Sequence, residues 1–336
     1  MMGRIVPPCR GLPMSALPPP AARKIAARGL FRRMPPAVFP PLLGLTGLGL
    51  AWRRAGDQTA LPGGLAELLL GGIFLLWCFM IGAYLSKVFR RPGVLREELS
   101  LLPGRAGLAA ADVSAFLMAA VVAPYLPGLA LAILVLAVGC HLCLGFAVLK
   151  AYFTGPEEAR VITPVWQLIF TGYIILPFTL EPLGYTQLAH LAYFYAVFSG
   201  LVLWLQAVWM LVKRIPPAPL RPLLAIHLAP ASLMVLSSVI LGYETMALLL
   251  AVVASGIFLA LLLSARWLTA AGFSPFWGAF TFPLAAFANA QMAMGWMITG
   301  ILALIAASAM VAFVASRVWQ MWARGTLAIK TNTPTA

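Results

Sequence analysis

Ten apolar runs, separated by short polar or turn-forming segments, dominate the pattern of hydrophobic and polar positions along this chain of 336 residues. Each run is close to the roughly 20 residues that an α-helix needs to cross a hydrocarbon layer of about 30 Å. Turn signals such as Leu126-Pro127-Gly128 connect neighbouring runs, which indicates antiparallel helical hairpins. We therefore predict an all-α polytopic membrane domain with ten transmembrane helices, over residues 36–52, 65–89, 109–126, 129–152, 161–183, 187–212, 223–241, 245–267, 276–292 and 296–319.

Prolines inside the apolar runs distinguish the odd-numbered helices. Pro124, Pro177, Pro230 and Pro283 follow one another at a constant spacing of 53 residues, and Pro41 has a comparable place in the first helix. An interior proline costs a soluble helix about 3 kcal/mol, so in a membrane it persists where neighbours satisfy the freed carbonyl group. The pattern favours five repeated hairpins in a ring, with proline-kinked odd helices inside, around a central pore, and even helices facing lipid. In the alternative interpretation, the prolines only assist packing in a bundle without a conduit.

Lys and Arg are distributed unevenly between the two sides of the predicted membrane domain. With the N-terminus inside, 21 of the 23 basic residues fall on the cytoplasmic side, and Arg53 and Arg54 fall outside. The positive-inside rule then predicts a multi-pass protein of the cytoplasmic (inner) membrane with both termini in the cytoplasm. Residues 1–33 are rich in Arg and Pro and predict a disordered basic tail, residues 34–322 the membrane domain, and residues 323–336 a short cytoplasmic C-terminal tail. The basic tail lacks the unbroken apolar run of a signal peptide, and a start of translation nearer Met34 is an open alternative.

Composition narrows the possible functions. With 62% hydrophobic and 10% charged residues, the chain is too apolar for a soluble domain. Its net charge of +14 lies between the apolar runs, where membrane orientation explains it, so we predict the lipid bilayer and not nucleic acid as a partner. Cys140 and Cys143 form a C-x-x-C in an apolar helix without a second pair of ligands. We therefore predict no metal and no cofactor.

Ionisable residues offer little chemistry inside the predicted helices. The nine acidic residues fall in loops or, like Asp112, near the ends of runs, and the three histidines are too scattered for a proton relay. No constellation of catalytic residues predicts an enzyme. His227, three residues before Pro230, could face a conduit as a polar group, although a hydrogen-bonded packing role is the more ordinary interpretation. Without fixed charges, the attraction for an anion would come from backbone dipoles exposed at the helix breaks.

Three segments carry a resemblance to a known family: PPAVFPPLLGLTGLGLAWR at residues 35–53, HLAPASLMVLS at 227–237 and FSPFWGAFTFPLAAFA at 273–288. They resemble the tellurite-resistance/dicarboxylate transporter family, which includes bacterial TehA-type channels, fungal malate and sulfite transporters and the slow-type anion channels of plant guard cells. The resemblance implies five hairpins in a quasi-fivefold arrangement, a pore in each subunit and assembly as a homotrimer.

The same resemblance implies roles for individual residues. Members of the family carry a phenylalanine in the ninth helix that occludes the pore, and the match to AFTFP places it at Phe282, with Phe280 as the fallback. Gly44 and Gly47 match small residues of the first helix that line the pore, where bulk would intrude. Gly278 departs from the pattern, because relatives often have a second large aromatic residue at this place.

These observations predict an anion channel or transporter gated by the ninth-helix phenylalanine. The permeant species would be small inorganic anions or organic acids, such as chloride- or nitrate-like ions, C4-dicarboxylates, sulfite or tellurite. The alternative is a gradient-driven exporter of dicarboxylates, sulfite or tellurite rather than a channel.

Overall fold

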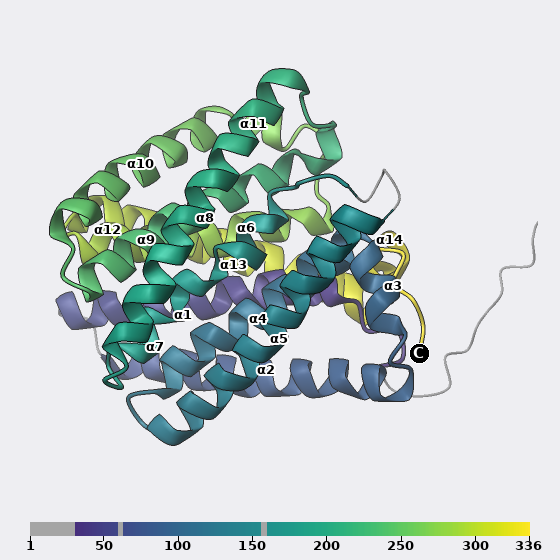
Figure 1. Ribbon diagram of the computed structural model, residues 1–336, viewed down its shortest axis with the longest axis horizontal. Coiled ribbons are helices and arrows are strands. Elements are labelled where there is room, and N and C mark those ends of the chain that lie inside the picture. Colours follow the sequence, from purple (N-terminus) through teal and green to yellow (C-terminus); the bar gives the residue numbers. More distant parts are fainter. Residues whose placement is uncertain (1–30, 60–62, 156–159) are drawn as a thin grey trace, which may run out of the picture. The chain divides into compact units, whose positions relative to one another are not determined.

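The computed structural model describes residues 31–59, 63–155 and 160–336, and all regular secondary structure among them is helical (Figure 1). Five long outer helices alternate along the chain with five inner segments, four of which combine α-helix with 3₁₀-helix. The outer helices are α2 (Gly63–Arg90), α5 (Pro127–Thr154), α8 (Thr186–Lys213), α10 (Glu244–Leu263) and α13 (Met297–Ala323). The inner segments are η1–α1 (Pro36–Val38 and Phe39–Gln58), α4 (Leu102–Val122), α6–η3–α7 (Val165–Phe170, Gly172–Ile175 and Pro177–Leu180), η4–α9 (Ala218–His227 and Leu228–Ile240) and η5–α12 (Pro275–Phe280 and Thr281–Ala293). Three short helices connect them or follow them: α3 (Val94–Ser100), α11 (Ala265–Leu268) and α14 (Thr326–Lys330).

Burial separates the inner segments from the outer helices. In their most apolar stretches, α4 and η4–α9 bury 72% and 78% of their residues, whereas the five outer helices bury only 17–33%. The outer helices expose large apolar side chains such as Leu68, Phe146 and Leu263. Exposure of so continuous an apolar surface to water is unfavourable, so the outer helices face lipid as the sequence predicts.

Seven of the described helices are long and apolar enough to cross a membrane: the five outer helices, α4 and η4–α9. The other three predicted spans coincide with α1, with the broken segment α6–η3–α7 and with η5–α12, whose α-helical part has 13 residues. The all-α, multi-pass membrane architecture is therefore confirmed. The number of ten crossings stays a prediction.

The prolines of the inner segments lie where an α-helix begins. Pro41, Pro230 and Pro283 are each the third residue of α1, α9 and α12, and each of these helices directly follows a 3₁₀ segment. Pro177 is the first residue of α7 and follows the 3₁₀ segment η3. A proline in the first turn of a helix sacrifices no hydrogen bond, because the N–H groups there have no partner within the helix. The break is thus a junction between 3₁₀ and α geometry rather than a bend in a continuous α-helix.

Pro124 contradicts the expected pattern. It lies exposed in the turn after α4, beyond the helix end at Val122, so the prediction of a kink at Pro124 was wrong. For Pro230 and Pro283 the spacing of 53 residues does reflect equivalent positions in α9 and α12. Each of these two helices ends before a glycine with positive φ, Gly242 (76°) and Gly295 (76°), which lies 12 residues after the proline.

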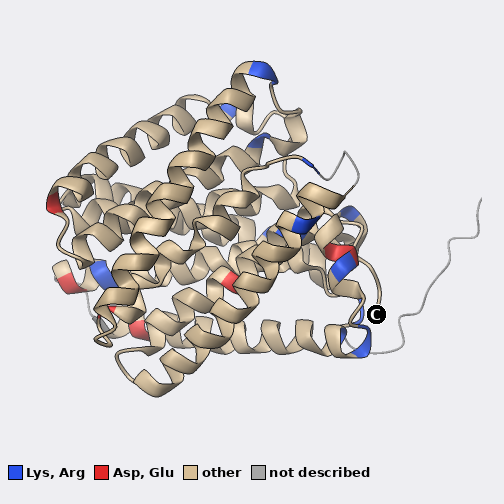
Figure 2. Cartoon of the chain, viewed as in Figure 1, with Lys and Arg blue, Asp and Glu red and all other residues tan. Residues whose placement is uncertain are grey.

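Charge divides the two ends of the helical bundle. Figure 2 shows most Lys and Arg at the helix ends where the inner segments begin, which we call the basic end, and most Asp and Glu at the opposite end. Lys87, Lys150 and Lys213 lie near the C-termini of the outer helices α2, α5 and α8, at the basic end. Arg53 and Arg54 lie in the last turns of α1, at the opposite end.

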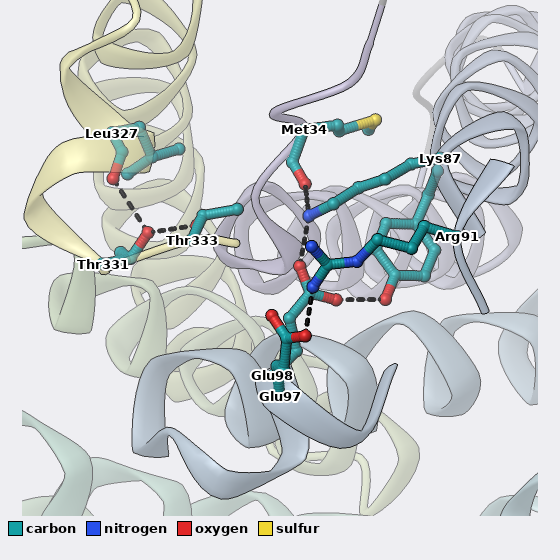
Figure 3. Close-up of polar contacts among 9 residues, drawn as sticks. Met34, Lys87, Arg91, Glu97, Glu98, Leu327, Thr331 and Thr333 are labelled. Carbon is teal, nitrogen blue, oxygen red and sulfur yellow. Dashed lines mark hydrogen bonds and ion pairs between the residues drawn. The ribbon is translucent and has the colours of Figure 1, made fainter. Parts of the chain in front are cut away.

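A buried ion pair holds the chain at the start of α1 (Figure 3). Nζ of Lys87 in α2 donates to the backbone oxygen of Met34 at 2.9 Å and pairs with Glu98 in α3. The Glu98 carboxylate also accepts a hydrogen bond from the Tyr84 hydroxyl group. Burial raises the pKa of Glu98, and the hydrogen bonds from Lys87 and Tyr84 oppose this shift. The contacts connect α2 and α3 to the residues that enter the first inner segment.

The C-terminal residues pack against the bundle at this same end. Leu327 of α14 is fully buried and belongs to the main hydrophobic core. The Thr331 hydroxyl group donates to the backbone oxygen of Leu327 at 2.8 Å (Figure 3). The backbone N–H of Ala336 donates to the backbone oxygen of Arg32 at 3.0 Å. The segment predicted as a C-terminal tail is therefore part of the packed structure.

Candidate functional site

The five inner segments enclose a cavity of about 50 Å³ near the basic end. Each inner segment contributes to its wall, and Leu43, Ala110, Leu168, Ala229 and Phe282 are one lining residue from each. Small side chains predominate, and the described lining residues carry no charge. A space of this kind offers an ion little to replace its hydration.

A second cavity, of about 20 Å³, continues the first toward the middle of the bundle. The two cavities share Leu168, Ile226, Ala229 and Phe282 in their walls. The second cavity extends further along α9, to Leu233. Phe282 therefore lies at the boundary between the two spaces.

A third cavity, of about 200 Å³, lies at the opposite end and is also lined by all five inner segments. Its wall differs in chemistry from the other two. It contains Arg53, Arg54 and Asp57 from α1 and Asn289 from α12, besides apolar residues of α4, α7 and α9. The inner segments thus surround a polar space at one end and an apolar space at the other.

The three cavities follow one face of each inner helix. On α9 the cavities are lined by Ala229, Leu233, Leu236 and Ile240, which are separated by four, three and four residues, and by Pro230 next to Ala229. This spacing keeps side chains on a single face of an α-helix. The cavities therefore lie along one line through the ring of inner segments, which we call the axis.

The ring of Phe282 is buried, with 4% of its surface exposed, and it packs against a glycine of α1. A Cβ atom at Gly47 would lie 2.7 Å from Cδ2 and 2.9 Å from Cε2 of Phe282. A Cβ atom at Gly44 would overlap the Thr281 side chain. Gly44 and Gly47 thus permit close approach of α1 and α12 and line none of the three cavities, which differs from the predicted pore-lining role. Gly47 instead determines where the Phe282 ring can lie.

Phe280, the alternative gate residue, lies away from the axis. Its ring packs edge-on against Trp277, with ring centroids 5.6 Å apart, and Trp277 also packs against Phe313 of α13. Phe280 lines none of the three cavities. The geometry at the axis therefore favours Phe282 over Phe280 as the residue that could close a pathway.

The model of the voltage-dependent anion channel family matches residues 33–327. The chain belongs to the voltage-dependent anion channel family. This finding confirms the resemblance seen in the sequence, and it makes the protein a membrane channel or transporter for anions. No curated protein matches the chain.

In this member of the voltage-dependent anion channel family, two arginines at the opposite end differ in their partners. Arg53 forms a bidentate pair with Glu67 of α2 at 2.6 and 2.8 Å, and Glu67 also accepts a hydrogen bond from Tyr125 at 2.6 Å. Arg54 donates to the neutral Asn289 side chain of α12. Arg54 is therefore the basic group of this cavity that is not neutralised by a direct carboxylate contact. The sequence already marked the two arginines, as the basic residues that fall outside the cytoplasmic side.

A contact between a largely buried aspartate and a buried histidine inside the membrane domain of this anion channel family member was not predicted from the sequence. Asp112 is the middle residue of α4, not near its end as predicted, and it contacts Nδ1 of His141 in α5. His141 is fully buried, and its Nε2 has no hydrogen-bond partner. A Cβ atom at Gly172 would lie 3.2 Å from this Nε2, and Gly172 and Val113 both line the second cavity. The pair thus lies directly behind the wall of the axis.

His227 does not face the axis. It lines a separate cavity of about 100 Å³ between α6, α8 and η4, and both of its ring nitrogens are buried without a partner. No described protein group therefore supplies the hydrogen bond expected for a packing role. Cys140 and Cys143 are exposed on α5, one of the lipid-facing helices.

Proposed function

We propose that the protein conducts small anions along the axis and that Phe282 is its steric gate. The observation that carries this proposal is the line of three cavities, each lined by inner segments and interrupted near Phe282. Phe282 lines both cavities on the basic side, and its buried ring lies at the boundary between them. The structure would then represent a closed state.

The chemistry of the walls supports selection by charge and by the cost of dehydration. At the opposite end, Arg54 provides a positive charge where an ion would enter or leave. Further along the axis no described lining residue of the first two cavities is charged, so ions that lose water at low cost would pass most easily. Weakly hydrated anions such as nitrate are therefore the preferred permeant class.

Reversal potentials of the purified protein in planar bilayers test this proposal. With chloride, nitrate, sulfite and malate on one side in turn, we expect anion-selective potentials, with nitrate more permeant than chloride. Currents that reverse at the cation equilibrium potential, or no current in protein that is correctly folded, would contradict the proposal.

A coupled exporter is the second candidate, and the Asp112–His141 pair favours it. Ionisable groups at the centre of a membrane helix are costly and often mark proton pathways. In this mechanism, dicarboxylate, sulfite or tellurite would move together with a proton, without resolvable single-channel events. Proton uptake into liposomes that depends on malate, and that is lost in Asp112→Asn, would distinguish the exporter from the channel.

The topology and assembly of the protein are proposals of a similar kind. The concentration of Lys and Arg at the basic end supports a cytoplasmic location of that end and of both termini, in the inner membrane. The resemblance to the tellurite-resistance/dicarboxylate transporter family supports a homotrimer with one axis per subunit. Labelling of single cysteines from each side of the membrane, and the mass of the protein in native detergent complexes, test these two proposals.

A further inference from the structure

The cavity that contains His227, which we call the side cavity, lies off the axis near the basic end. Its volume is about 100 Å³. Gln167 from α6, Leu203 from α8 and His227 from η4 form part of its wall, and Thr163 and Arg214 come from the segments before α6 and after α8. The side cavity is thus enclosed by segments far apart in the sequence.

Polar atoms without partners are concentrated in the side cavity. Oγ1 of Thr163, Nε2 of Gln167 and both ring nitrogens of His227 are buried and form no hydrogen bond with the protein. A buried polar group without a partner costs about 1–3 kcal/mol, and most such groups in proteins are satisfied by protein or by ordered water. Four such atoms around one cavity of this size indicate that the cavity is suited to bind a polar ligand.

The unsatisfied groups are mainly hydrogen-bond donors. The carbonyl oxygen of Gln167 already accepts a hydrogen bond from Thr171 at 2.7 Å, which leaves its NH₂ group to point elsewhere. Gln167 is 2% exposed, so bulk water cannot serve this group. The Thr163 hydroxyl group and a His227 N–H add further donors, and Arg214 adds a permanent positive charge. The described lining residues include no carboxylate.

Donors together with one positive charge select a small anion with several acceptor oxygens. We infer that the side cavity is an anion-binding site, separate from the axis, for a small oxyanion or carboxylate. Gln167 also lines the second cavity of the axis, so an anion held by its NH₂ group would lie directly behind the wall of the axial pathway. Binding in the side cavity does not require conduction along the axis.

Thermal unfolding of the purified full chain tests this inference, with sodium nitrate as the probe. Sodium gluconate at equal ionic strength is the reference, because gluconate is too large for the side cavity. Nitrate should raise the midpoint of unfolding in a saturable manner, because a ligand that binds only the folded state stabilises it by RT ln(1 + [L]/Kd). In His227→Leu and Gln167→Leu the nitrate-dependent rise should disappear.

The behaviour without nitrate separates a binding site from a packing role. Leu at position 227 removes two buried nitrogens that have no partner, so the midpoint in gluconate should rise or stay the same. A structural role for His227 would instead lower it. His190→Leu is the matched control: it removes a histidine that bonds to the Tyr243 hydroxyl group at 2.9 Å near the opposite end, so it should lower the midpoint and retain the nitrate response.

Two outcomes overturn the inference. One is a nitrate response that is unchanged in both His227→Leu and Gln167→Leu, which would place the bound nitrate elsewhere. The other is a lowered midpoint in gluconate for His227→Leu. Phe282→Ala distinguishes this inference from the proposed function: it should alter the conductance and leave the nitrate-dependent rise in place. Loss of that rise in Phe282→Ala alone would assign the nitrate to the axis and refute the side cavity.

Discussion

The two ends of the axis are built from the same five inner segments and yet differ in chemistry. Near the basic end, the walls consist of small apolar side chains and prolines at the starts of helices. At the opposite end, α1 contributes Arg53, Arg54 and Asp57, and α12 contributes Asn289. The end of the protein with the most Lys and Arg therefore has the uncharged part of the axis, and the end with the fewest has the charged part.

This difference indicates that the basic residues serve two separate purposes. Those at the basic end orient the protein in the membrane and hold connecting segments, as Lys87 does with Glu98. Arg54, at the other end, lines the third cavity, where in the proposed function its charge would act on an ion at the mouth of the axis. In the proposed function, the charged end attracts the anion, the apolar end requires the anion to lose water, and Phe282 lies nearer the apolar end.

The largest effect is expected from Phe282→Ala, which removes the bulk that interrupts the axis on the apolar side. We expect the anion conductance to rise by about tenfold or more, since each 1.4 kcal/mol removed from a barrier is a factor of ten in rate. Bilayer currents measure this effect. Phe280→Ala is the matched control and should leave the current unchanged, because Phe280 packs on Trp277 away from the axis.

Asp112→Asn tests the contact between Asp112 and His141, which lies behind the wall of the second cavity, between the two ends of the axis. Removing one partner of a buried hydrogen-bonded pair leaves the other unsatisfied at a cost of about 1–3 kcal/mol, whereas replacing both partners by apolar residues can be nearly neutral or stabilising. Thermal unfolding in detergent should therefore show a large loss of stability in Asp112→Asn and its recovery in Asp112→Leu/His141→Leu. An equal loss in the single and double variants would show that the contact between Asp112 and His141 contributes nothing specific.

Three variants of α1 test the charged end, and the expected changes in anion conductance differ in direction. Arg54→Gln should lower the anion conductance about fivefold at 0.1 M salt, and Asp57→Asn should raise it, because a unit charge about 4 Å away in water acts with about 1 kcal/mol, a factor of about five in rate. Arg53→Gln should have the smaller effect, since Glu67 already neutralises Arg53. Currents at 1 M salt, where the screening length falls to about 3 Å, should bring all three variants close to the wild type. Equal effects of Arg53→Gln and Arg54→Gln would remove the special role of Arg54.

The smallest effect is expected from Gly47→Ala, whose Cβ atom would displace the Phe282 ring. The conductance should change in the presence of Phe282 and should not change further in the Phe282→Ala background, which a double-mutant cycle measures. Gly139→Ala, at a glycine with open space around it, is the control. Additive effects of Gly47→Ala and Phe282→Ala would show that the two residues act independently.

Much of the fold could be predicted from the sequence because it depends on local properties. Apolar length and the turn signals located the five outer helices and the inner segments between them, and the sequence marked helix breaks in inner segments at Pro177, Pro230 and Pro283. The constant spacing gave a wrong prediction of a kink at Pro124, because sequence distance does not show whether a proline precedes a helix or follows it. The ends of α4 are also shifted toward the N-terminus from the predicted span, and this shift moved Asp112 from the end of the helix to its middle.

The parts of the site that the sequence did not predict depend on contacts between distant segments. The Asp112–His141 pair joins α4 and α5, and the different partners of Arg53 and Arg54 come from α2 and α12. The side cavity around His227 likewise needs α6, α8 and η4 together. Phe282 was predicted as the gate from a resemblance in sequence, and this role stays a prediction, whereas Gly47 was assigned to the pore wall and instead packs against the Phe282 ring.

The measurement that most directly tests the axial pathway is the block of current by a negatively charged thiol reagent at a single cysteine. The four native cysteines are first replaced by serine, and Ala120→Cys then places a thiol in the third cavity, in the conducting Phe282→Ala background. Leu136→Cys, on the lipid-facing side of α5, is the control. We predict that a methanethiosulfonate with a sulfonate group abolishes the current through Ala120→Cys and leaves that through Leu136→Cys intact. Unimpaired current through modified Ala120→Cys would show that anions do not follow the axis.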